Sequence, residues 1–443
     1  MTKFSQYNHL FEHKGKHYVY NMFSTSLIEL DGRCQTLFAN DRLAEFSSEE
    51  IEQLIFQGMV VDAELDEAKQ YNLFYENSRS AACQKFALIF VPTYCCNLAC
   101  PYCFEGQHKE KKKISFAEID AILAFVRNKV QNPDPDIAIK KMSCSLFGGE
   151  PLLCMDELKY FCNGIISITD QYKIELNLSL TTNFTLANKD VFEFIKKYNI
   201  ATQVTIDGTK KEHDTRRITK NGDGTYDLIL KNLQEAKEAG LKHLLSIRLN
   251  IDTQNLETAE EALLRVKDYA SFVYFGILQD YNEINKAFKP DCLGEREEQE
   301  ALTQNLYPLL EKYGLYCPYM FGKKSPCVLN CQNKFVIDCN LDVYGCSTLL
   351  GHKKARLGYL NNKGTFLALP QYYEQMNYSP FNFEKCRKCK WLPMCGGSCT
   401  SATFLADSKH NLAKITTPVC AVNEQLLNIQ LKRYVEHLTE IKK

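Results

Sequence analysis

Two groups of spaced cysteines limit what this chain can fold into and which chemistry it can perform. One group has the spacing CxxxCxxC and the other the spacing CxxCx5CxxxC. Chance would produce the four-cysteine run in only about one such chain in five hundred, so we interpret it as a site. Thiolates at these spacings select iron–sulfur clusters or zinc. The groups are Cys96, Cys100 and Cys103, and Cys386, Cys389, Cys395 and Cys399.

Composition narrows the class of protein. The chain has 443 residues, of which 45% are hydrophobic, so it can bury more than one core. Neither a signal peptide nor a membrane span is visible, and we expect a cytoplasmic protein without a membrane partner. Disulfides are rare in a reducing compartment, so clustered cysteines indicate metal. A net charge of -1 provides no basic surface, and we expect no nucleic-acid partner.

The pattern of the chain changes along its length. Short strand-like runs and a charged helical stretch predict a small α+β domain at the start. Apolar strands then alternate with helices, and a cysteine-rich zone follows. The expected segments are the small domain at 1–85, an alternating domain at 86–290, a linker at 291–326 with a helix near 296–313, the cysteine-rich domain at 327–425 and a C-terminal helix at 426–443.

Six strand-then-helix units in the alternating domain predict an α/β fold, a parallel sheet curled into a partial (β/α)6 barrel of the TIM type. Ser115 and Glu118 form an expected capping box, and Gly240 ends a helix that begins near Tyr226. The expected strands are FALIFVP, MSCSLFGG, IELNLSLTTN, ATQVTIDG, LLSIRLNID and FVYFGIL.

The carboxyl ends of parallel strands converge, and the first cysteine group directly follows the first strand. Its thiolates should therefore project into the mouth of the barrel. Three cysteines leave one iron of a four-iron cluster open to another ligand. Gly148, Gly149 and Glu150 follow the second strand, where backbone can approach a ligand closely and a carboxylate can accept from an amine.

These motifs resemble the radical S-adenosylmethionine (radical SAM) superfamily. TTN at 181–183, TIDGTKKEHDTRR at 205–217 and a G-x-G-T turn at 222–225 resemble its subgroup with a C-terminal SPASM domain. The resemblance implies a 4Fe-4S cluster on the first cysteine group, with S-adenosylmethionine (AdoMet) on its open iron. It also implies reductive cleavage of AdoMet to methionine and a 5′-deoxyadenosyl radical, which abstracts a hydrogen atom from the substrate.

The resemblance assigns roles to individual residues. Tyr102 would border the adenine, and Gly149 with Glu150 would hold the methionyl amine. Thr205, where the family more often has serine, would reach the ribose, and Arg217 would pair with the AdoMet carboxylate. The other residues expected at the cofactor are Gly148, Thr182, Asn183 and Asp207.

The seven-cysteine pattern of a full SPASM domain implies two auxiliary 4Fe-4S clusters. The first would use Cys327, Cys346 and Cys399; the second, Cys386, Cys389, Cys395 and Cys420. The first lacks a certain fourth ligand, for which Cys317, Cys331 and an open iron that binds a substrate thiolate are the alternatives.

Two positions depart from the family pattern. Leu341 replaces the usual glycine before the second SPASM cysteine. Ser347 replaces the acid that serves as base in anaerobic sulfatase-maturating enzymes, which argues against that activity.

The first 85 residues resemble the PqqD-like, winged-helix type of peptide-recognition domain. Such a domain binds a leader peptide as an added strand at its sheet edge. The alternative is a domain that only caps the barrel.

Structural interpretations stand beside these functional ones. Zinc is the rival metal for the cysteine groups, and the remaining cysteines fit core positions. Glu150 could instead cap a helix. Asp207, Asp338 or Asp342 could supply a base, although acids at such positions are usually structural.

We therefore expect a peptide maturase with three 4Fe-4S clusters that crosslinks a ribosomally made precursor peptide, with a flavodoxin- or ferredoxin-type reductant. A thioether is the leading product, followed by a carbon–carbon or carbon–oxygen bond. The alternatives are a formylglycine-generating sulfatase maturase and a non-catalytic electron-transfer or zinc scaffold protein.

Overall fold

The structure of the chain is a computed structural model. The structure describes residues 1–80, 84–103, 105, 111–131, 134, 137–278, 297, 300–315, 326–407, 409–420 and 424–441. Cys317, one alternative for the fourth ligand of the first auxiliary cluster, lies outside the described residues.

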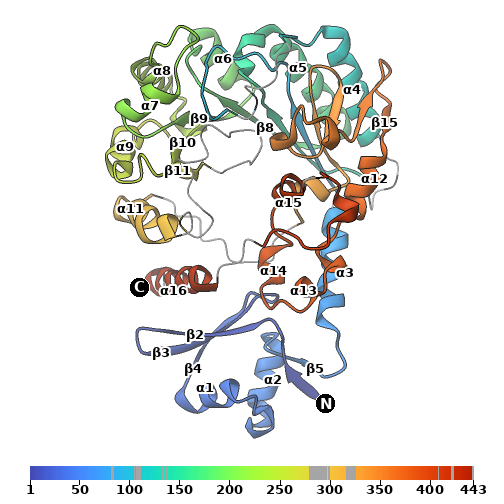
Figure 1. The fold of residues 1–443 in the computed structure, drawn as a ribbon, viewed down its shortest axis with the longest axis vertical. Coiled ribbons are helices and arrows are strands. Elements are labelled where there is room, and N and C mark those ends of the chain that lie inside the picture. The colour runs from blue at the N-terminus through green and yellow to red at the C-terminus, as the bar shows by residue number, and fades with distance from the viewer. Residues whose placement is uncertain are drawn as a thin grey trace.

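Six parallel strands form the centre of the molecule (Figure 1). They lie side by side in chain order, and every neighbouring pair is parallel. This confirms the α/β class and the six expected strands. The strands are β6 (Lys85–Phe90), β7 (Lys141–Leu146), β8 (Glu175–Thr182), β9 (Ala201–Ile206), β10 (Leu245–Ile251) and β11 (Phe272–Ile277).

Helices cover the outer face of this curved sheet (Figure 1). The ring of Phe161 stacks on Phe90 of β6 at 4.0 Å between centroids, within one continuous apolar core. The capping box at Ser115 and Glu118 is present, as expected. The helices are α4 (Phe116–Val130), α5 (Met155–Tyr172), α6 (Lys189–Lys197), α7 (Lys210–Arg216), α8 (Tyr226–Glu238) and α9 (Ala259–Val266).

The cysteine-rich zone continues the barrel sheet. Strand β12 (Lys334–Ile337) pairs in parallel with β6, and three antiparallel strands follow it. Phe335, Val336 and Ile337 are buried, so adding this apolar strand covers the edge of β6. The further elements are β13 (Asp342–Tyr344), β14 (Gly358–Leu360), β15 (Phe366–Ala368), α12 (Pro370–Asn377), α13 (Glu384–Arg387), α14 (Leu392–Cys395) and α15 (Thr400–Ala406).

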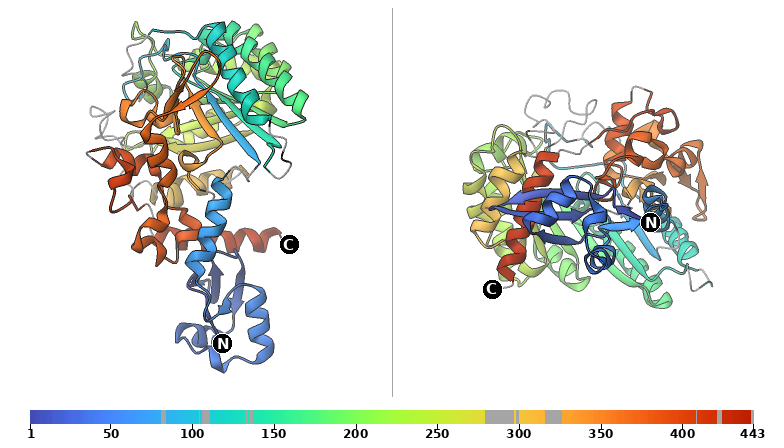
Figure 2. Two further views of the ribbon diagram at one scale, coloured as in Figure 1. Left: turned by 90° about the vertical axis from the view of Figure 1, so that its right-hand side faces the viewer. Right: turned by 90° about the horizontal axis from the view of Figure 1, so that it is seen from below.

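The N-terminal residues form a small α+β unit that projects from the barrel (Figure 2). Two small antiparallel sheets, ordered β1-β5 and β2-β3-β4, pack with helices. The strands and helix expected around residues 17–58 are present. The elements are β1 (Thr2–Phe4), β2 (Asn8–His13), β3 (Lys16–Asn21), β4 (Leu27–Leu30), α1 (Gly32–Ala39), α2 (Ser48–Phe56), β5 (Val60–Asp62) and α3 (Glu67–Arg79).

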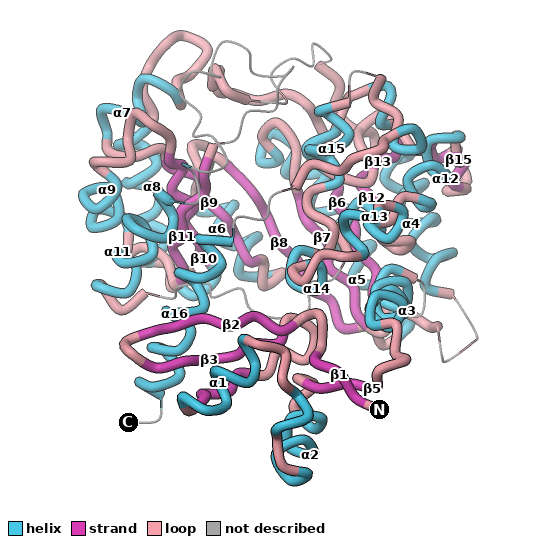
Figure 3. Tube along the Cα trace, turned by 60° about the horizontal axis from the view of Figure 1, so that its bottom comes forward, coloured by secondary structure: helices cyan, strands magenta, loops and turns pink. Residues whose placement is uncertain are grey.

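The C-terminal helix α16 (Glu424–Ile441) lies against the N-terminal unit (Figure 3). Glu436 accepts from Lys14 Nζ at 2.6 Å and lies 3.1 Å from His13 Nε2. Helix α3 runs from the same unit toward the barrel (Figure 2), and Arg79 near its end donates to backbone carbonyls of the cysteine-rich zone. Both ends of the chain therefore help to hold the small unit in place.

Short segments complete the described chain. The linking helix expected near 296–313 is represented by a π-helical turn, Ala301–Leu306, and by α11 (Tyr307–Lys312). No helix in the described ranges is long and apolar enough to cross a bilayer. The short 3₁₀ segments are η1 (Leu43–Glu45), η3 (Pro151–Cys154), η4 (Lys242–Leu244), η7 (Val328–Asn330), η8 (Ser347–Leu349), η9 (Lys353–Ala355), η10 (Pro380–Asn382) and η11 (Leu412–Lys414).

Candidate active site

A cavity of about 320 Å³ lies at the carboxyl ends of the parallel strands. It brings together residues from four separate motifs, as the parallel topology predicts. All the residues predicted for the first cluster and AdoMet line it, except Glu150 and Asp207, whose side chains are buried. Those that line it are Cys96, Cys100, Tyr102, Cys103, Gly148, Gly149, Thr182, Asn183, Thr205 and Arg217.

The two glycines after β7 hold the cysteine loop. A Cβ atom on Gly149 would lie 2.4 Å from the carbonyl oxygen of Cys95, and one on Gly148 would lie 2.6 Å from that of Thr93. The Gly149 N–H donates to Thr93 O at 3.1 Å, and the Glu150 N–H donates to Cys95 O at 2.8 Å. The glycines let backbone approach the chain that positions Cys96; both also line the cavity, and their close approach to a ligand stays a prediction.

The Glu150 carboxylate is engaged by protein donors. One oxygen accepts from the Thr182 hydroxyl at 2.7 Å and from the Leu152 N–H at 3.0 Å. The other accepts from the Asn183 N–H at 2.7 Å. Burial raises the pKa of this carboxyl. Glu150 therefore caps η3 and joins the ends of β7 and β8, which is the structural role considered as an alternative; its role toward an amine stays a prediction.

Tyr102, Asp207 and Arg217 form one buried network. The Tyr102 hydroxyl donates to Asp207, and Arg217 Nη1 donates to the Tyr102 oxygen at 3.0 Å. Asn250 Nδ2 also donates to Asp207, at 3.0 Å. Arg217 Nη1 lies 3.9 Å from Asp207. The guanidinium is thus paired within the protein, although its buried Nε has no hydrogen-bond partner among the described residues and remains able to meet a bound acceptor.

The turn after α7 braces the cysteine loop from the other side. The Ala99 N–H donates to Ile218 O at 2.8 Å, and Leu98 forms a β-bridge with Thr219. The Thr225 hydroxyl donates to Arg217 O at 2.6 Å. The TIDG and G-x-G-T motifs therefore contribute to the site partly by holding the loop that carries the three thiols.

The three thiols are partly buried. Burial raises the pKa of Cys96 to about 11 and that of Cys103 to about 12, and it also raises the pKa of Cys100. Their thiolates therefore need a positive partner such as iron. The Leu98 N–H already points to Cys96 Sγ at 3.4 Å, the kind of hydrogen bond that tunes an iron–sulfur centre.

Several residues that line the cavity were not singled out for it by the sequence. Glu105 is 4% exposed, one of its carboxylate oxygens has no hydrogen-bond partner in the part of the chain that the structure describes, and burial raises its pKa to about 8. Ser347 and Thr348 reach the same cavity from the cysteine-rich zone. The sequence signal that could have identified Glu105 is its position two residues after Cys103, the last cysteine of the CxxxCxxC motif. Gln203, Arg248 and Asn250 are further polar side chains of the barrel strands that line it.

The cysteines predicted to bind the first auxiliary cluster lie near one another in the structure. The Cys346 and Cys399 sulfurs lie 4.0 and 3.1 Å from the Ser401 hydroxyl oxygen, and Cys327 interacts with Cys399. Lys334, whose pKa is lowered by burial, is close enough to Cys327, Cys331 and Cys346 to interact with all three thiols. Cys331 is therefore a neighbour of the predicted ligands.

The cysteines predicted to bind the second auxiliary cluster also lie near one another. Cys386 interacts with Cys389, Cys395 and Cys420, and burial raises its pKa to about 11. No three Cys, His, Asp or Glu side chains of the described residues lie close enough to share one metal ion. In a cubane, however, each cysteine binds a different iron.

This geometry matches a known family. Residues 90–266 match the family model of the radical SAM superfamily. The chain therefore contains a radical SAM domain, and the protein is an enzyme. The match supports AdoMet and one 4Fe-4S cluster as its cofactors, and the buried thiols beside a cavity with orphaned polar atoms fit them.

This radical SAM enzyme is similar to proteins of two functional groups. It is 23% identical over 326 residues to a cysteine-type anaerobic sulfatase-maturating enzyme of Clostridium novyi, covering 69% of this chain and 84% of that protein. Its fold resembles anSMEcpe with bound AdoMet and a Kp18Cys peptide, with a TM-score of 0.63, 18% identity and coverage of 81% of this chain and 99% of that one. It also resembles Streptococcus suis SuiB bound to its precursor peptide SuiA, with a TM-score of 0.51, 17% identity and coverage of 94% and 100%.

Proposed function

We propose that this radical SAM enzyme crosslinks a ribosomally made precursor peptide, with a thioether between a cysteine sulfur and a carbon atom as the leading product and a carbon–carbon or carbon–oxygen bond next. One observation carries the proposal: Ser347 lines the radical cavity and directly follows Cys346, a predicted ligand of the first auxiliary cluster. A substrate in the cavity would therefore lie beside a second redox centre.

The residues around the cavity have distinct roles in this proposal. Cys96, Cys100 and Cys103 would hold the cluster that, when bound with AdoMet, supplies one electron and generates the 5′-deoxyadenosyl radical. Gly149 keeps the cysteine loop against the end of β7, and Arg217 presents its free Nε to a bound acceptor. Thr205 and Tyr102 line the cavity where the ribose and adenine would lie.

The electrons in thioether formation balance only if an electron acceptor is present. Loss of one hydrogen atom from a peptide carbon leaves a carbon radical, and bonding to a thiol sulfur releases a proton and one electron. An auxiliary cluster held by Cys327, Cys346 and Cys399 would accept that electron, and a flavodoxin- or ferredoxin-type protein would supply the electron used at the first cluster.

We infer that Cys331 is the fourth ligand of the first auxiliary cluster. It lies four residues after Cys327, with its Sγ 3.8 Å from the Cys327 carbonyl oxygen, and it shares Lys334 as a neighbour with Cys327 and Cys346. The second cluster would use Cys386, Cys389, Cys395 and Cys420.

The N-terminal unit fits leader-peptide recognition in this proposal. Strand β4 ends its sheet and has one neighbour, β3, which leaves an edge for strand addition. SuiB, which was solved with its precursor peptide, matches 94% of this chain, whereas anSMEcpe matches 81%.

Sulfatase maturation is the second candidate, favoured by the similarity to the Clostridium novyi enzyme. Position 347, where those enzymes place an acid, does line the cavity. Because the residue there is serine, whose hydroxyl is a poor base at neutral pH, peptide crosslinking is the better-supported proposal.

The experiment begins anaerobically. The protein is reconstituted with iron and sulfide and reduced with AdoMet, and 5′-deoxyadenosine is quantified beside a Cys100→Ala variant. Peptides encoded beside the gene and a synthetic cysteine-containing sulfatase peptide are then offered as substrates. A thioether removes two hydrogens and keeps the sulfur, whereas formylglycine formation from cysteine replaces sulfur by oxygen. High-resolution mass spectrometry separates these outcomes, and modification of the sulfatase peptide alone would reject crosslinking.

A further inference from the structure

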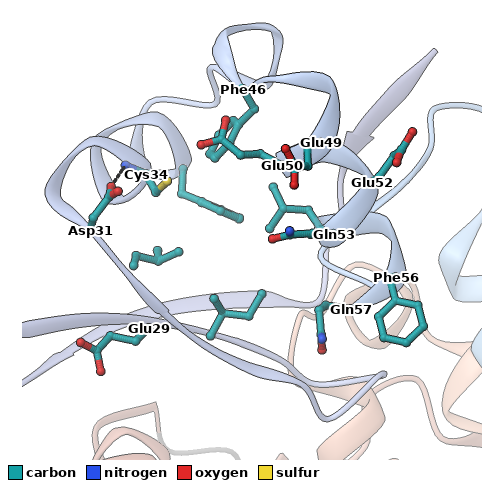
Figure 4. A pocket seen from close by; sticks show the side chains of 14 residues that line it. Glu29, Asp31, Cys34, Phe46, Glu49, Glu50, Glu52, Gln53, Phe56 and Gln57 are labelled. Atoms are coloured by element: carbon teal, nitrogen blue, oxygen red, sulfur yellow. Dashed lines mark hydrogen bonds between the residues drawn. The ribbon is translucent and has the colours of Figure 1, made fainter.

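A hollow of about 760 Å³ opens on the N-terminal unit between β4 and helices α1 and α2 (Figure 4). It is far in sequence from every cysteine of the radical cavity. Its floor is apolar, and it lies beside the free edge of β4. The floor consists of Ile28, Leu30, Phe38, Phe46 and Leu54.

The free edge can accept another strand. The Asn21 N–H donates to Ser26 O, and the antiparallel register continues from there along β3 and β4. Because hydrogen-bonded and non-hydrogen-bonded pairs alternate, Leu27 and Glu29 direct their backbone N–H and C=O groups away from β3. An extended peptide could pair with these groups while its side chains enter the hollow.

An exposed aromatic side chain borders the same hollow. Phe56, at the end of α2, is 87% exposed and lines the hollow, as Figure 4 shows. The preceding residue, Ile55, is 45% exposed. A large aromatic ring left in water at the rim of an apolar hollow offers a contact surface to a partner.

The charged side chains that line the hollow are all negative. Five carboxylates line the hollow and no lysine, arginine or histidine does, in a stretch of chain that is described throughout. Two of the carboxylates form ion pairs within the protein: Glu29 is 2.8 Å from Lys16, and Glu50 is 2.7 Å from Arg33. The carboxylates are Glu29, Asp31, Glu49, Glu50 and Glu52.

The remaining charges are not neutralised by the protein. Asp31 accepts from the Cys34 N–H and caps α1, whereas Glu49 and Glu52 are exposed and form no ion pair with described residues. Glu49 lies in the first turn of α2, where a carboxylate also favours the helix dipole, but Glu52 lies beyond it. Both carboxylates remain available to cations of a bound partner.

We propose that this hollow binds an extended, basic segment of the precursor peptide, in which an apolar side chain enters the hollow and neighbouring lysine or arginine side chains meet Glu49 and Glu52. The proposal rests on the proposed peptide substrate, and it deepens that function by naming the chemistry of the recognition segment. Opposite charges would speed association and select against acidic peptides.

The test selects peptides from an unbiased pool. A random 12-residue mRNA-display library is selected on the immobilised, reconstituted full-length protein, and the recovered sequences are compared with the starting pool. The expected result is enrichment of lysine and arginine around an apolar residue. Recovery of acidic or charge-neutral binders would overturn the proposal.

Matched variants locate the binding site. Binding of a selected peptide should weaken roughly tenfold or more in a Glu49→Lys/Glu52→Lys variant, with a smaller loss as salt rises. Phe56→Ala should weaken it without altering the charge. The control Glu12→Lys/Glu64→Lys reverses two exposed charges outside the hollow and should leave affinity unchanged. Equal binding by all variants overturns the proposal.

Further outcomes separate this proposal from the proposed function. Formation of 5′-deoxyadenosine without substrate should be equal in Glu49→Lys/Glu52→Lys and the parent protein. If basic peptides bind the hollow but no peptide is ever modified, the crosslinking function fails and the recognition site stands. If a precursor is modified equally well by both proteins, the recognition site fails and the function stands. Sedimentation that shows a dimer abolished by Phe56→Ala would assign the edge to a second copy of the chain and overturn the proposal.

Discussion

Replacing Gly149 by alanine should disrupt the cluster loop. The added Cβ would lie 2.4 Å from Cys95 O and 2.5 Å from Tyr94 O, whereas ordinary contacts begin near 3.4 Å. Both obstacles are backbone atoms, so one chain must move by about 1 Å. Overpacking of this size costs about 1–3 kcal/mol, and weakening the two hydrogen bonds between Gly149–Glu150 and the loop adds roughly 1–3 kcal/mol.

The assay compares Gly149→Ala with Gly32→Ala. Gly32 is the first residue of α1, has open space where a Cβ would stand, and gains helix propensity from alanine. We expect Gly149→Ala to lower the denaturation midpoint, the iron content and the yield of 5′-deoxyadenosine together, while Gly32→Ala matches the parent. Parent-like iron content and 5′-deoxyadenosine yield in Gly149→Ala would refute the steric argument.

Three further predictions follow from buried groups. Burial lowers the pKa of His213 to about 4 from 6.5, so the unfolded chain binds protons more readily between these values. About 3 kcal/mol of stability, present above pH 6.5, should be lost as pH falls toward 4, and His213→Gln should flatten this part of a denaturation-against-pH profile. Trp391→Ala should cost about 3–5 kcal/mol because Trp391 is 4% exposed within the core that joins the N-terminal unit to the cysteine-rich zone; proteolysis that releases the unit no faster than in the parent would contradict this. Cys331→Ala should lower the iron bound per chain while Cys34→Ala does not, and equal iron in both would exclude Cys331 as a ligand.

Much of the barrel could be predicted because the sequence patterns that specify its strands and helices are local. The six strands are short apolar runs separated by helical periodicity, and the Ser115–Glu118 capping box marks a helix start within four residues. Parallel connection then places the ends of all strands at one rim. This topology predicts that Cys96 and Gly149 lie around one cavity, and the family resemblance adds Asn183 and Thr205; all four line it.

Contacts between segments far apart in the sequence could not be predicted from local sequence patterns. Nothing local to residues 334–337 marks them as the neighbour of β6, because an apolar strand can pair with any open edge. The partners of Glu150 lie on another strand, and Ser347 reaches the cavity only because the cysteine-rich zone continues the sheet.

Local sequence patterns restrict the chemistry of the radical SAM domain, since the spacing of Cys96, Cys100 and Cys103 on one loop limits which metal centres they can hold. Folding decides which groups far apart in the sequence share a site: Cys331 and Cys346 both lie near Lys334, and carboxylates of α2 line the same hollow as β4. The physical reason is that spacing along the chain restricts neighbours within a turn or two, whereas long-range neighbours depend on which apolar faces and strand edges pack together.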